Sequence, residues 1–367
     1  MNCDIKSLAK TIVNYSIDVQ PNEKVLIIYY SNESLDLIKE ITKCICLRDG
    51  ITNCKMVDKQ LESLLLKQNN KKIIDILIDE KKYYIDNYDS IIYIKYTSNE
   101  YESNTVSKNI MNYYSISSKD IDNIRVNDRK WVLLNYPSII DAVSAKTGYD
   151  DYKEYCFNVM NYDYSKMYNK LLPLKRLMEK TNMVRMIGPG TNISFSIKNM
   201  PAIPCCGKYN IPDGEIYTAP IKNSVNGIIT YNTPSPYMGN IYNNISLKFI
   251  DGKIVEATCD GDNTKLNEIF NTDDGARYIG EFSFGINPKI LYPIGNILFD
   301  EKIKGSIHFT PGRAYLDCFN GNSSAIHWDL VWVQREEFGG GEVYFDDVLI
   351  RKDGIFILDE LKELNNL

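Results

Sequence analysis

The chain has 367 residues, of which 44% are apolar and 25% charged, and its formal net charge is −6. This length predicts roughly two or three domains, and the composition is ordinary for a globular protein. The acidic balance, without a basic run interleaved with aromatic residues, argues against a nucleic-acid partner, and the apolar runs are too short to span a membrane. Because the N-terminal residues also lack the features of a secretory signal, we expect a cytoplasmic protein.

Strand-like and helix-like segments alternate over the first half of the chain. Short apolar runs rich in Ile, Val and Tyr predict strands, and apolar residues at helical spacing predict the helices between them. In chain order the expected elements are a strand at 25–30, a helix at 34–47, a strand at 53–57, a helix at 71–80 and a strand at 91–96. This alternation is typical of an α/β layer built from strand–helix–strand units.

A further helix is expected over residues 164–180, where apolar side chains recur at helical spacing. Pro173 lies inside this segment and should kink the helix or divide it, because proline lacks the backbone N–H that a helix interior needs. We expect this segment to link two domains.

After residue 183 the pattern changes to short strands separated by Gly, Pro and Asn. Such punctuation predicts a mainly antiparallel sheet with few helices. The expected strands are residues 193–197, 227–231, 246–250, 306–309 and 329–333, followed by a hairpin over 342–354. The predicted fold class is therefore an N-terminal α/β domain, residues 1–180, followed by a mainly antiparallel-sheet α+β domain, residues 181–367.

The two histidines of the chain, His308 and His327, lie in one C-terminal block that is also rich in carboxylates. Imidazole is the commonest neutral metal ligand and a usual proton carrier, whereas an isolated histidine is more often a core residue bonded to the backbone. Residues 325–333 have the composition of a strand, which would place His327 and Asp329 on one face. Because burying an imidazole beside a carboxylate is costly without a cation or a proton network, the block favours a metal site.

Three further carboxylates of the second half extend this ligand set. Glu215 follows a Pro-Asp-Gly turn at the start of an expected strand, and Glu281 lies between apolar residues. Glu301 belongs to an Asp-Glu pair shortly before His308. Taken singly, each is more often a turn or surface carboxylate. Together with the histidines and Asp329 they offer ligands for two divalent cations, which carboxylates bridge and imidazoles cap.

The nine cysteines are scattered along the chain without a Cys-x-x-Cys spacing. In a cytoplasmic protein they are expected to be reduced, mostly buried and not bound to metal. The adjacent Cys205 and Cys206 are too close in sequence to form a tetrahedral site without distant partners. The His-Glu-x-x-His, Gly-x-Ser-x-Gly and phosphate-loop motifs of other enzyme classes are absent from the sequence.

The block around the histidines and carboxylates resembles the thermophilic-type metallo-aminopeptidases, the family of aminopeptidase T and aminopeptidase S. The resemblance covers nearly the whole chain in order, but its specific motifs begin at residue 178, and the N-terminal half is similar only in its α/β pattern. The motifs are residues 178–181, 188–191, 210–220, 280–287, 300–301, 308 with 312–315, and 327–329. Several motifs in the same order are more specific than any one of them.

The resemblance implies a two-domain, co-catalytic metallo-exopeptidase that removes the N-terminal residue from peptides with a free N-terminus and works as a homodimer. The residues at the family's metal-ligand positions are Glu215, Glu281, His308, His327 and Asp329. Glu301 falls on the acidic position before the first histidine, and Tyr315 on the tyrosine beside the metals. The expected cofactors are two divalent ions, and the mixed carboxylate and imidazole ligands suit zinc, cobalt and manganese alike.

The expected chemistry follows from this ligand set. Two adjacent cations bring the pKa of a bridging water toward neutrality and polarise the scissile carbonyl, so they supply the nucleophile and the Lewis acid together. We predict that Glu281 bridges the metals, that Glu301 shuttles the proton unless it ligates instead, and that Tyr315 hydrogen-bonds the oxyanion. Two alternatives stay open: an inactive binding protein of the same fold, and a two-metal hydrolase of another bond, such as a phosphoester, which the lack of a basic phosphate clamp disfavours.

Overall fold

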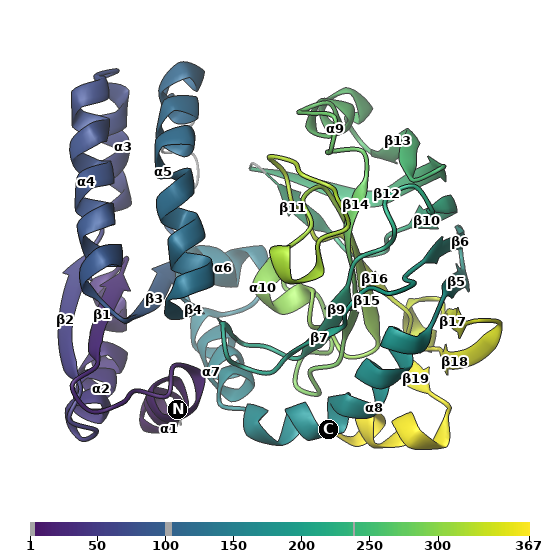
Figure 1. Cartoon of the computed structure of the whole chain (residues 1–367), viewed down its shortest axis with the longest axis horizontal. Coiled ribbons are helices and arrows are strands. Elements are labelled where there is room, and N and C mark those ends of the chain that lie inside the picture. The colour runs from purple at the N-terminus through teal and green to yellow at the C-terminus, as the bar shows by residue number, and fades with distance from the viewer. Residues whose placement is uncertain (1–3, 100–104, 238) are drawn as a thin grey trace. The chain divides into compact units, whose positions relative to one another are not determined.

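The computed structural model describes residues 4–99, 105–237 and 239–367, and the chain folds into two compact units (Figure 1). The first unit comprises Met1–Tyr162 with Gly207–Pro212, and the second comprises Asp163–Cys206 with Asp213–Leu367. The first has a parallel sheet and the second is mainly antiparallel, so the predicted fold class is confirmed. The units divide before the expected linking helix rather than after it, because that helix buries its apolar face within the second unit.

The sheet of the first unit is parallel, with the strand order β2-β1-β3-β4-β8. Its strands are β1 (Lys24–Tyr29), β2 (Ile51–Met56), β3 (Ser90–Tyr96), β4 (Lys130–Tyr136) and β8 (Asn210–Ile211). In β1, Val25, Leu26 and Ile27 are wholly buried in succession, as expected for a strand that is covered on both faces. The three strands predicted in this region are confirmed, although β2 begins at Ile51 rather than at residue 53.

The helices of the first unit pack in pairs, α1 on α2 and α4 on α5. The helices are α1 (Ile5–Thr11), followed by a π-helical turn (Ile12–Ser16), a 3-10 turn (Asn32–Ser34), α2 (Leu35–Cys46), α3 (Lys59–Lys67), α4 (Lys71–Asn87), α5 (Lys108–Asp128), α6 (Ile139–Ser144) and α7 (Tyr149–Met160). α2 buries Leu37, Ile41 and Ile45, whose spacing makes one apolar stripe. The helix predicted at 71–80 is longer in the structure because Ile85 also packs into the core.

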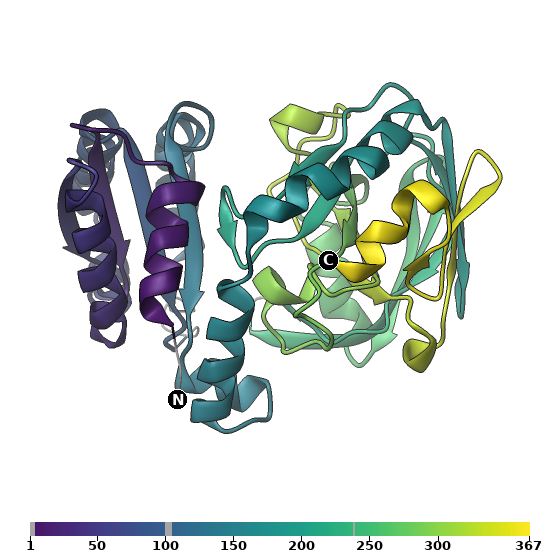
Figure 2. The same ribbon diagram turned by 90° about the horizontal axis from the view of Figure 1, so that it is seen from below.

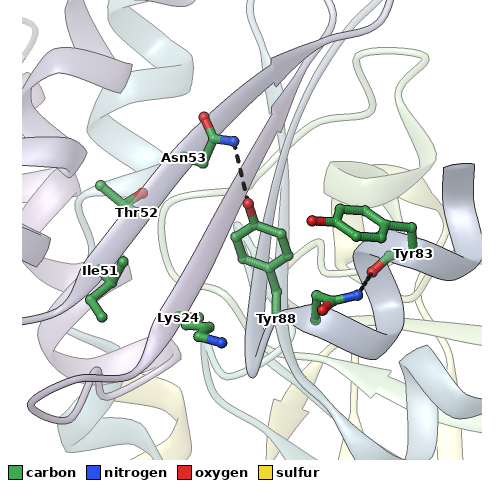
Figure 3. Close-up of a pocket in the computed structure, with 7 residues that line it drawn as sticks. Lys24, Ile51, Thr52, Asn53, Tyr83 and Tyr88 are labelled. Carbon is green, nitrogen blue, oxygen red and sulfur yellow. Dashed lines mark hydrogen bonds between the residues drawn. The ribbon is translucent and has the colours of Figure 1, made fainter.

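A cavity of about 250 Å³ lies between β2 and the end of α4 (Figure 3). Its lining residues are Lys24, Ile51, Thr52, Asn53, Tyr83, Asn87 and Tyr88. Asn53 donates a hydrogen bond of 3.3 Å to the hydroxyl of Tyr88. The residues predicted to bind metal or to act in catalysis do not line this cavity.

The helix α8 (Met167–Lys180) begins the second unit, after a 3-10 turn at Tyr164–Lys166. Its buried side chains share a helical spacing and are Met167, Leu171, Leu174 and Met178. The backbone stays helical through Pro173, so the helix is not divided there, and the buried face continues on both sides of the proline. Figure 2 shows α8 beside the C-terminal 3-10 helix Asp359–Asn366, which it contacts.

Two antiparallel sheets form the body of the second unit, as predicted. The larger has the strand order β11-β12-β10-β6-β5-β17-β18-β19 with β13 beside β12, and the smaller has the order β16-β15-β14-β9-β7. The strands of the larger sheet are β5 (Met183–Gly188), β6 (Thr191–Ser196), β10 (Asn226–Thr230), β11 (Ser235–Tyr237), β12 (Asn240–Ile250), β13 (Lys253–Asp260), β17 (Glu342–Phe345), β18 (Val348–Lys352) and β19 (Ile355–Phe356).

The smaller sheet and the connecting helices complete this unit. Its strands are β7 (Ile203–Cys205), β9 (Glu215–Thr218), β14 (Ile279–Gly285), β15 (Ser306–Pro311) and β16 (Val331–Val333). The short helices are α9 (Asn263–Phe270), α10 (Ile297–Asp300) and the 3-10 turns Leu316–Cys318 and Glu336–Phe338. Over the ranges that the structure describes, no helix has both the length and the apolar content needed to cross a bilayer.

The core of the second unit lies between the two sheets and is rich in aromatic rings. Phe195 of β6 packs on Phe282 of β14 and on Phe309 of β15, with ring centroids 5.0 and 4.9 Å apart. Because side chains alternate along a strand, the neighbours of Phe282 and Phe309 face away from this core. These neighbours are Glu281, Ser283, His308 and Thr310. The smaller sheet therefore has a polar face opposite its apolar one.

Candidate metal centre

Residues of three neighbouring strands meet on the polar face of the smaller sheet. β14 pairs with β15 so that Ser283 lies opposite His308, and with β9 so that Gly285 lies opposite Glu215. An irregularity in the pairing near the start of β14 shifts the register at Glu281. The sheet thus brings together three predicted ligands that are far apart in the sequence.

Gly285 lets the loop after α10 approach the sheet, because it has no side chain. A Cβ at this position would lie 2.5 Å from the carbonyl oxygen of Ile303 and 2.8 Å from that of Glu301. The close approach leaves the Glu301 carbonyl oxygen 3.0 Å from Nδ1 of His308. A larger residue at Gly285 would displace the loop and the backbone partner of this histidine.

The first group of candidate ligands consists of Glu215, Glu281 and His308, whose ligand atoms all lie within 4.8 Å of one another. Nε2 of His308 is 2.9 Å from Oε1 of Glu281 and 3.3 Å from Oε2 of Glu215. The three residues are 6%, 3% and 1% exposed, in that order. Because each residue is on a strand, we call this set the strand group.

The second group consists of Glu281, His327 and Asp329, and it shares Glu281 with the strand group. Nε2 of His327 is 3.3 Å from Oε2 of Glu281 and 3.2 Å from Oδ1 of Asp329. His327 and Asp329 precede β16 in an irregular segment, so we call this set the loop group. As the sequence predicted, the imidazole and the carboxylate lie together.

The strand predicted over residues 325–333 is wrong in its extent, since only Val331–Val333 is regular. His327 is instead held by an isolated backbone bridge to Gly312. Between His327 and the start of β16, Trp328 packs against Tyr237 and Phe270, with its ring centroid 4.6 Å and 5.9 Å from theirs. Regular pairing with β15 ends where this tryptophan enters an aromatic cluster whose members come from distant parts of the sequence.

Each histidine is oriented by a backbone carbonyl oxygen. Nδ1 of His308 lies 3.0 Å from the carbonyl oxygen of Glu301, and Nδ1 of His327 lies 2.7 Å from that of Arg313. A carbonyl oxygen only accepts, so each Nδ1 carries a hydrogen, and Nε2 is the ring nitrogen that faces the carboxylates. Metal-binding histidines are held in the same manner.

Imidazoles and carboxylates in the two groups alter one another's pKa. Burial alone would lower the pKa of His308, but its hydrogen bond and its charge interaction with Glu281 raise the pKa to about 10. Burial alone would raise the pKa of Asp329, but the charge of His327 holds it well below its usual range. These pairs share protons that a divalent cation can replace, so metal binding at this centre is coupled to proton release.

The donor set fits divalent cations. Nε2 of His327 is buried and makes no hydrogen bond of good geometry within the described part of the chain. Two carboxylate oxygens nevertheless lie 3.2 and 3.3 Å from it. A cation between these atoms would satisfy the imidazole and the carboxylates together, and such ligands suit zinc, cobalt and manganese.

The two residues predicted to act beside the ligands lie next to the two groups. Burial raises the pKa of Glu301 to about 8, although the charge of Lys302 lowers it, and the carboxylate contacts the Lys302 ammonium. The ring of Tyr315 lies 4.7 Å from the ring of His327 and 5.6 Å from that of Tyr217. Glu301 therefore borders the strand group through its backbone contact with His308 and through Lys302, which also approaches Glu215, and Tyr315 borders the loop group.

The structure adds three residues that the sequence reasoning missed. Lys302 is wholly buried with Nζ 3.6 Å from Oε1 of Glu215; burial would lower its pKa, but Glu215, Glu301 and Asp213 raise it well above the usual value. Cys205 of β7 pairs with Glu215 of β9, and with Asp213 these residues form a third group of candidate ligands. The available signals were weak, because a lysine beside an Asp-Glu pair is more typical of a surface and the Cys205 pairing depends on strand register.

The family of thermophilic metalloproteases (M29) matches residues 1–355 of the chain. The chain belongs to this family. The resemblance inferred from the ordered motifs is therefore confirmed, and a metalloprotease family accords with the clustered carboxylate and imidazole ligands.

Relatives of this M29 family member include proteins named as aminopeptidases. Aminopeptidase 2 of Geobacillus stearothermophilus is 31% identical over 166 residues, which cover 40% of this chain and 37% of that protein. Aminopeptidase AmpS of Bacillus subtilis is 33% identical over 128 residues, which cover 33% of this chain and 30% of that protein. The matched part of the chain thus spans less than two fifths of the length of these relatives.

Wild-type AmpT from Thermus thermophilus has a similar structure. The TM-score is 0.77, and the superposition covers 96% of this chain and 99% of that chain at 15% sequence identity. This likeness extends over both units and concerns their fold.

Proposed function

We propose that this M29 family member is a two-metal aminopeptidase that hydrolyses the N-terminal peptide bond of substrates with a free N-terminus. The observation that carries the proposal is the sharing of Glu281 by two ligand groups, one with His308 and the other with His327. Two groups joined by one carboxylate fit a pair of divalent ions, whereas a closed structural zinc site takes about four ligands around one ion. The names of the relatives support a peptide substrate.

The ligand groups divide the proposed centre between two ions. Glu215 and His308 would hold one ion, His327 and Asp329 would hold the other, and Glu281 would bridge them. Bound zinc, cobalt or manganese would polarise the scissile carbonyl and make water acidic enough to attack it near neutral pH.

Glu301 is our candidate for proton transfer. Because burial raises its pKa to about 8, its carboxyl group can hold a proton near neutral pH. It would take the proton from the attacking water and give it to the leaving amine. One oxygen of its carboxylate contacts the Lys302 ammonium, which favours the shuttle role over ligation.

Tyr315 is our candidate donor to the oxyanion that develops on the scissile carbonyl. Its ring packs on His327, and burial together with the charges of Glu281 and Asp329 raises the pKa of its hydroxyl well above the usual value, so the hydroxyl lies near the loop group. A hydroxyl at such a position can donate a hydrogen bond to the negative oxygen as the bond is attacked.

The activity is tested with a short peptide that has a free N-terminus and with its N-acetylated twin. Each is incubated with the protein and added zinc, cobalt or manganese, with and without chelator. We expect single residues to be released in order from the free peptide, and the release to stop with chelator, because the free amine places the first peptide bond at the centre. Equal cleavage of the acetylated peptide would reject an exopeptidase.

A phosphodiester and a binding assay serve as controls for the alternatives. Turnover of the phosphodiester alone would favour a two-metal hydrolase of another bond. Binding of the free peptide without turnover at any metal would favour an inactive protein of the same fold. Elemental analysis of reconstituted protein accompanies both assays. A value of one bound ion per chain throughout a metal titration would reject the two-metal centre.

We also propose that the protein is a homodimer, as the family resemblance implies, and that it is located in the cytoplasm. Light scattering coupled to size-exclusion chromatography should give twice the mass of one chain, and the monomer mass would contradict this assembly. Cell fractionation tests the compartment, and recovery of the protein outside the cytoplasm would contradict it.

A further inference from the structure

Lys302 is a cation that the fold itself brings to the centre. Its side chain is wholly buried, its Nζ contacts the carboxylate of Glu301, and it lies 3.6 Å from Oε1 of Glu215. The other oxygen of Glu215, Oε2, lies 3.3 Å from Nε2 of His308. The two oxygens of this carboxylate therefore face different partners, the lysine on one side and the strand group on the other.

The carboxylate that faces Lys302 also belongs to the third ligand group, which consists of Cys205, Asp213 and Glu215. Cys205 and Glu215 are directly paired residues of neighbouring strands, so their side chains project from the same face of the sheet. Asp213 is 2% exposed. A thiolate with two carboxylates is a ligand set for thiophilic divalent ions such as zinc and cobalt. The Lys302 ammonium is close to the same carboxylates that such an ion would need.

Charge balance favours two ions when Lys302 is present. The buried carboxylates of the cluster are Asp213, Glu215, Glu281, Glu301 and Asp329. With Glu301 in its ionised form beside the Lys302 ammonium, these five carboxylates and one ammonium leave four negative charges, which two divalent ions neutralise while the histidines bind as neutral ligands. Without the ammonium one further negative charge would stay unpaired, and an unpaired buried charge is costly enough to attract another cation.

We infer that Lys302 acts as a built-in third cation, which limits the centre to two metal ions by excluding a thiophilic divalent ion from the group of Cys205, Asp213 and Glu215. The inference rests on the proposed two-metal centre and adds a positioning role to it. By occupying Oε1 of Glu215, the lysine leaves Oε2 as the oxygen offered to the strand group.

The test uses the full chain, stripped of metal with a chelator and titrated with cobalt. Cobalt–thiolate bonds give a near-ultraviolet charge-transfer absorption that oxygen and nitrogen ligands do not give. The wild type should bind two cobalt ions per chain without this absorption. Lys302→Met keeps the length of the side chain and removes its charge, so it should bind a third ion. The absorption should appear with the third equivalent, as the Cys205 thiol releases its proton to solvent.

Two variants serve as matched controls. Lys304 is the neighbouring lysine, and its ammonium donates to the carbonyl oxygen of Asn365 (2.6 Å) rather than to the carboxylates of the centre. Lys304→Met should therefore bind two ions, like the wild type. The double variant Lys302→Met with Cys205→Ser should lack the charge-transfer absorption, because the third ligand group then has no thiol.

The outcomes separate this inference from the proposed function. Fewer than two ions in the wild type would contradict the two-metal centre itself. If the wild type and a folded Lys302→Met variant each bind two ions, and the variant shows no thiolate absorption, the inference about Lys302 is overturned but the two-metal centre is not. If circular dichroism shows that Lys302→Met does not fold, the wild type and Cys205→Ser decide. A thiolate absorption in the wild type, or an ion lost in Cys205→Ser, would overturn the inference. The absence of both effects would support it.

Discussion

The strand group and the loop group share one carboxylate but are built differently. Glu215, Glu281 and His308 all belong to strands, and none of their side chains is more than 8% exposed. His327 and Asp329 come from the irregular segment before β16, and their side chains are 12% and 14% exposed. The strand group is thus part of the sheet, whereas the loop group joins one strand residue to two residues that lie outside a regular strand.

This difference has a consequence for metal binding. Regular elements hold side chains in place more closely than loops do, so we expect the strand group to bind its ion more tightly and to exchange it more slowly. The exposed side of the centre is also the side of Tyr315. An asymmetric pair of this kind suits the proposed reaction, because substrate can approach the loop group while the strand group keeps its ligands.

The largest effect is expected from Glu281→Gln, because Glu281 belongs to both groups. The amide keeps the shape of the side chain but removes its charge and one acceptor oxygen, so both ions should bind more weakly. Turnover of a free peptide should fall by more than about 10³-fold. Elemental analysis, activity and far-ultraviolet circular dichroism are measured on the same sample, and retention of two ions with most of the activity would exclude a shared role.

His327→Ala should affect one group and spare the other. We expect one ion per chain to remain, in the strand group, while turnover is abolished and the fold stays largely intact. In the wild type, titration with a chelator should remove the two ions in two steps, the loop-group ion first. Simultaneous loss of both ions would remove the distinction between the groups, and loss of structure in both this variant and Glu281→Gln would make the centre structural.

Part of this centre could be predicted because its signals are local in the sequence. His308 and His327 are the two histidines of the chain, and alternation along β14 and β15 shows which side chains face away from the apolar core. The strands β1, β2 and β3 and the helices α2 and α4 of the first unit were also predicted, and β1 is the continuous apolar run expected of a parallel strand covered on both faces.

The rest depended on contacts between distant residues. In the segment before β16, Trp328 packs against Tyr237 and Phe270, and the local strand composition does not reveal these contacts. The position of Cys205 opposite Glu215 requires the register of β7 on β9. Lys302 follows two acidic residues, a pattern that predicts exposure, and only the fold shows that it is buried.

Thr310→Val should weaken metal binding by the loop group, with a smaller effect than His327→Ala. The Thr310 hydroxyl donates a hydrogen bond of 2.7 Å to Oδ1 of Asp329 and so orients a carboxylate that lacks strand support. Removing such a partner typically weakens metal binding by about 10–100-fold. Competition with a chromophoric chelator measures both affinities, and we expect only the weaker one to fall. An equal fall in the tighter affinity would show that the threonine acts on the whole centre.

Ser283→Ala is the corresponding change in the strand group and should have the smallest effect. The Ser283 oxygen is 3.1 Å from the carbonyl oxygen of Ile216 and 3.4 Å from Oε2 of Glu215. A hydroxyl has one hydrogen to donate, and the nearer carbonyl takes it, so Glu215 depends on the sheet rather than on the serine for its position. The variant should lose about 1 kcal/mol of stability and less than about threefold in the tighter metal affinity. Thermal unfolding and the same chelator competition measure the two quantities. A fall in affinity as large as that of Thr310→Val would mean that hydrogen bonds orient both groups to the same degree, and the two groups would then differ in exposure but not in rigidity.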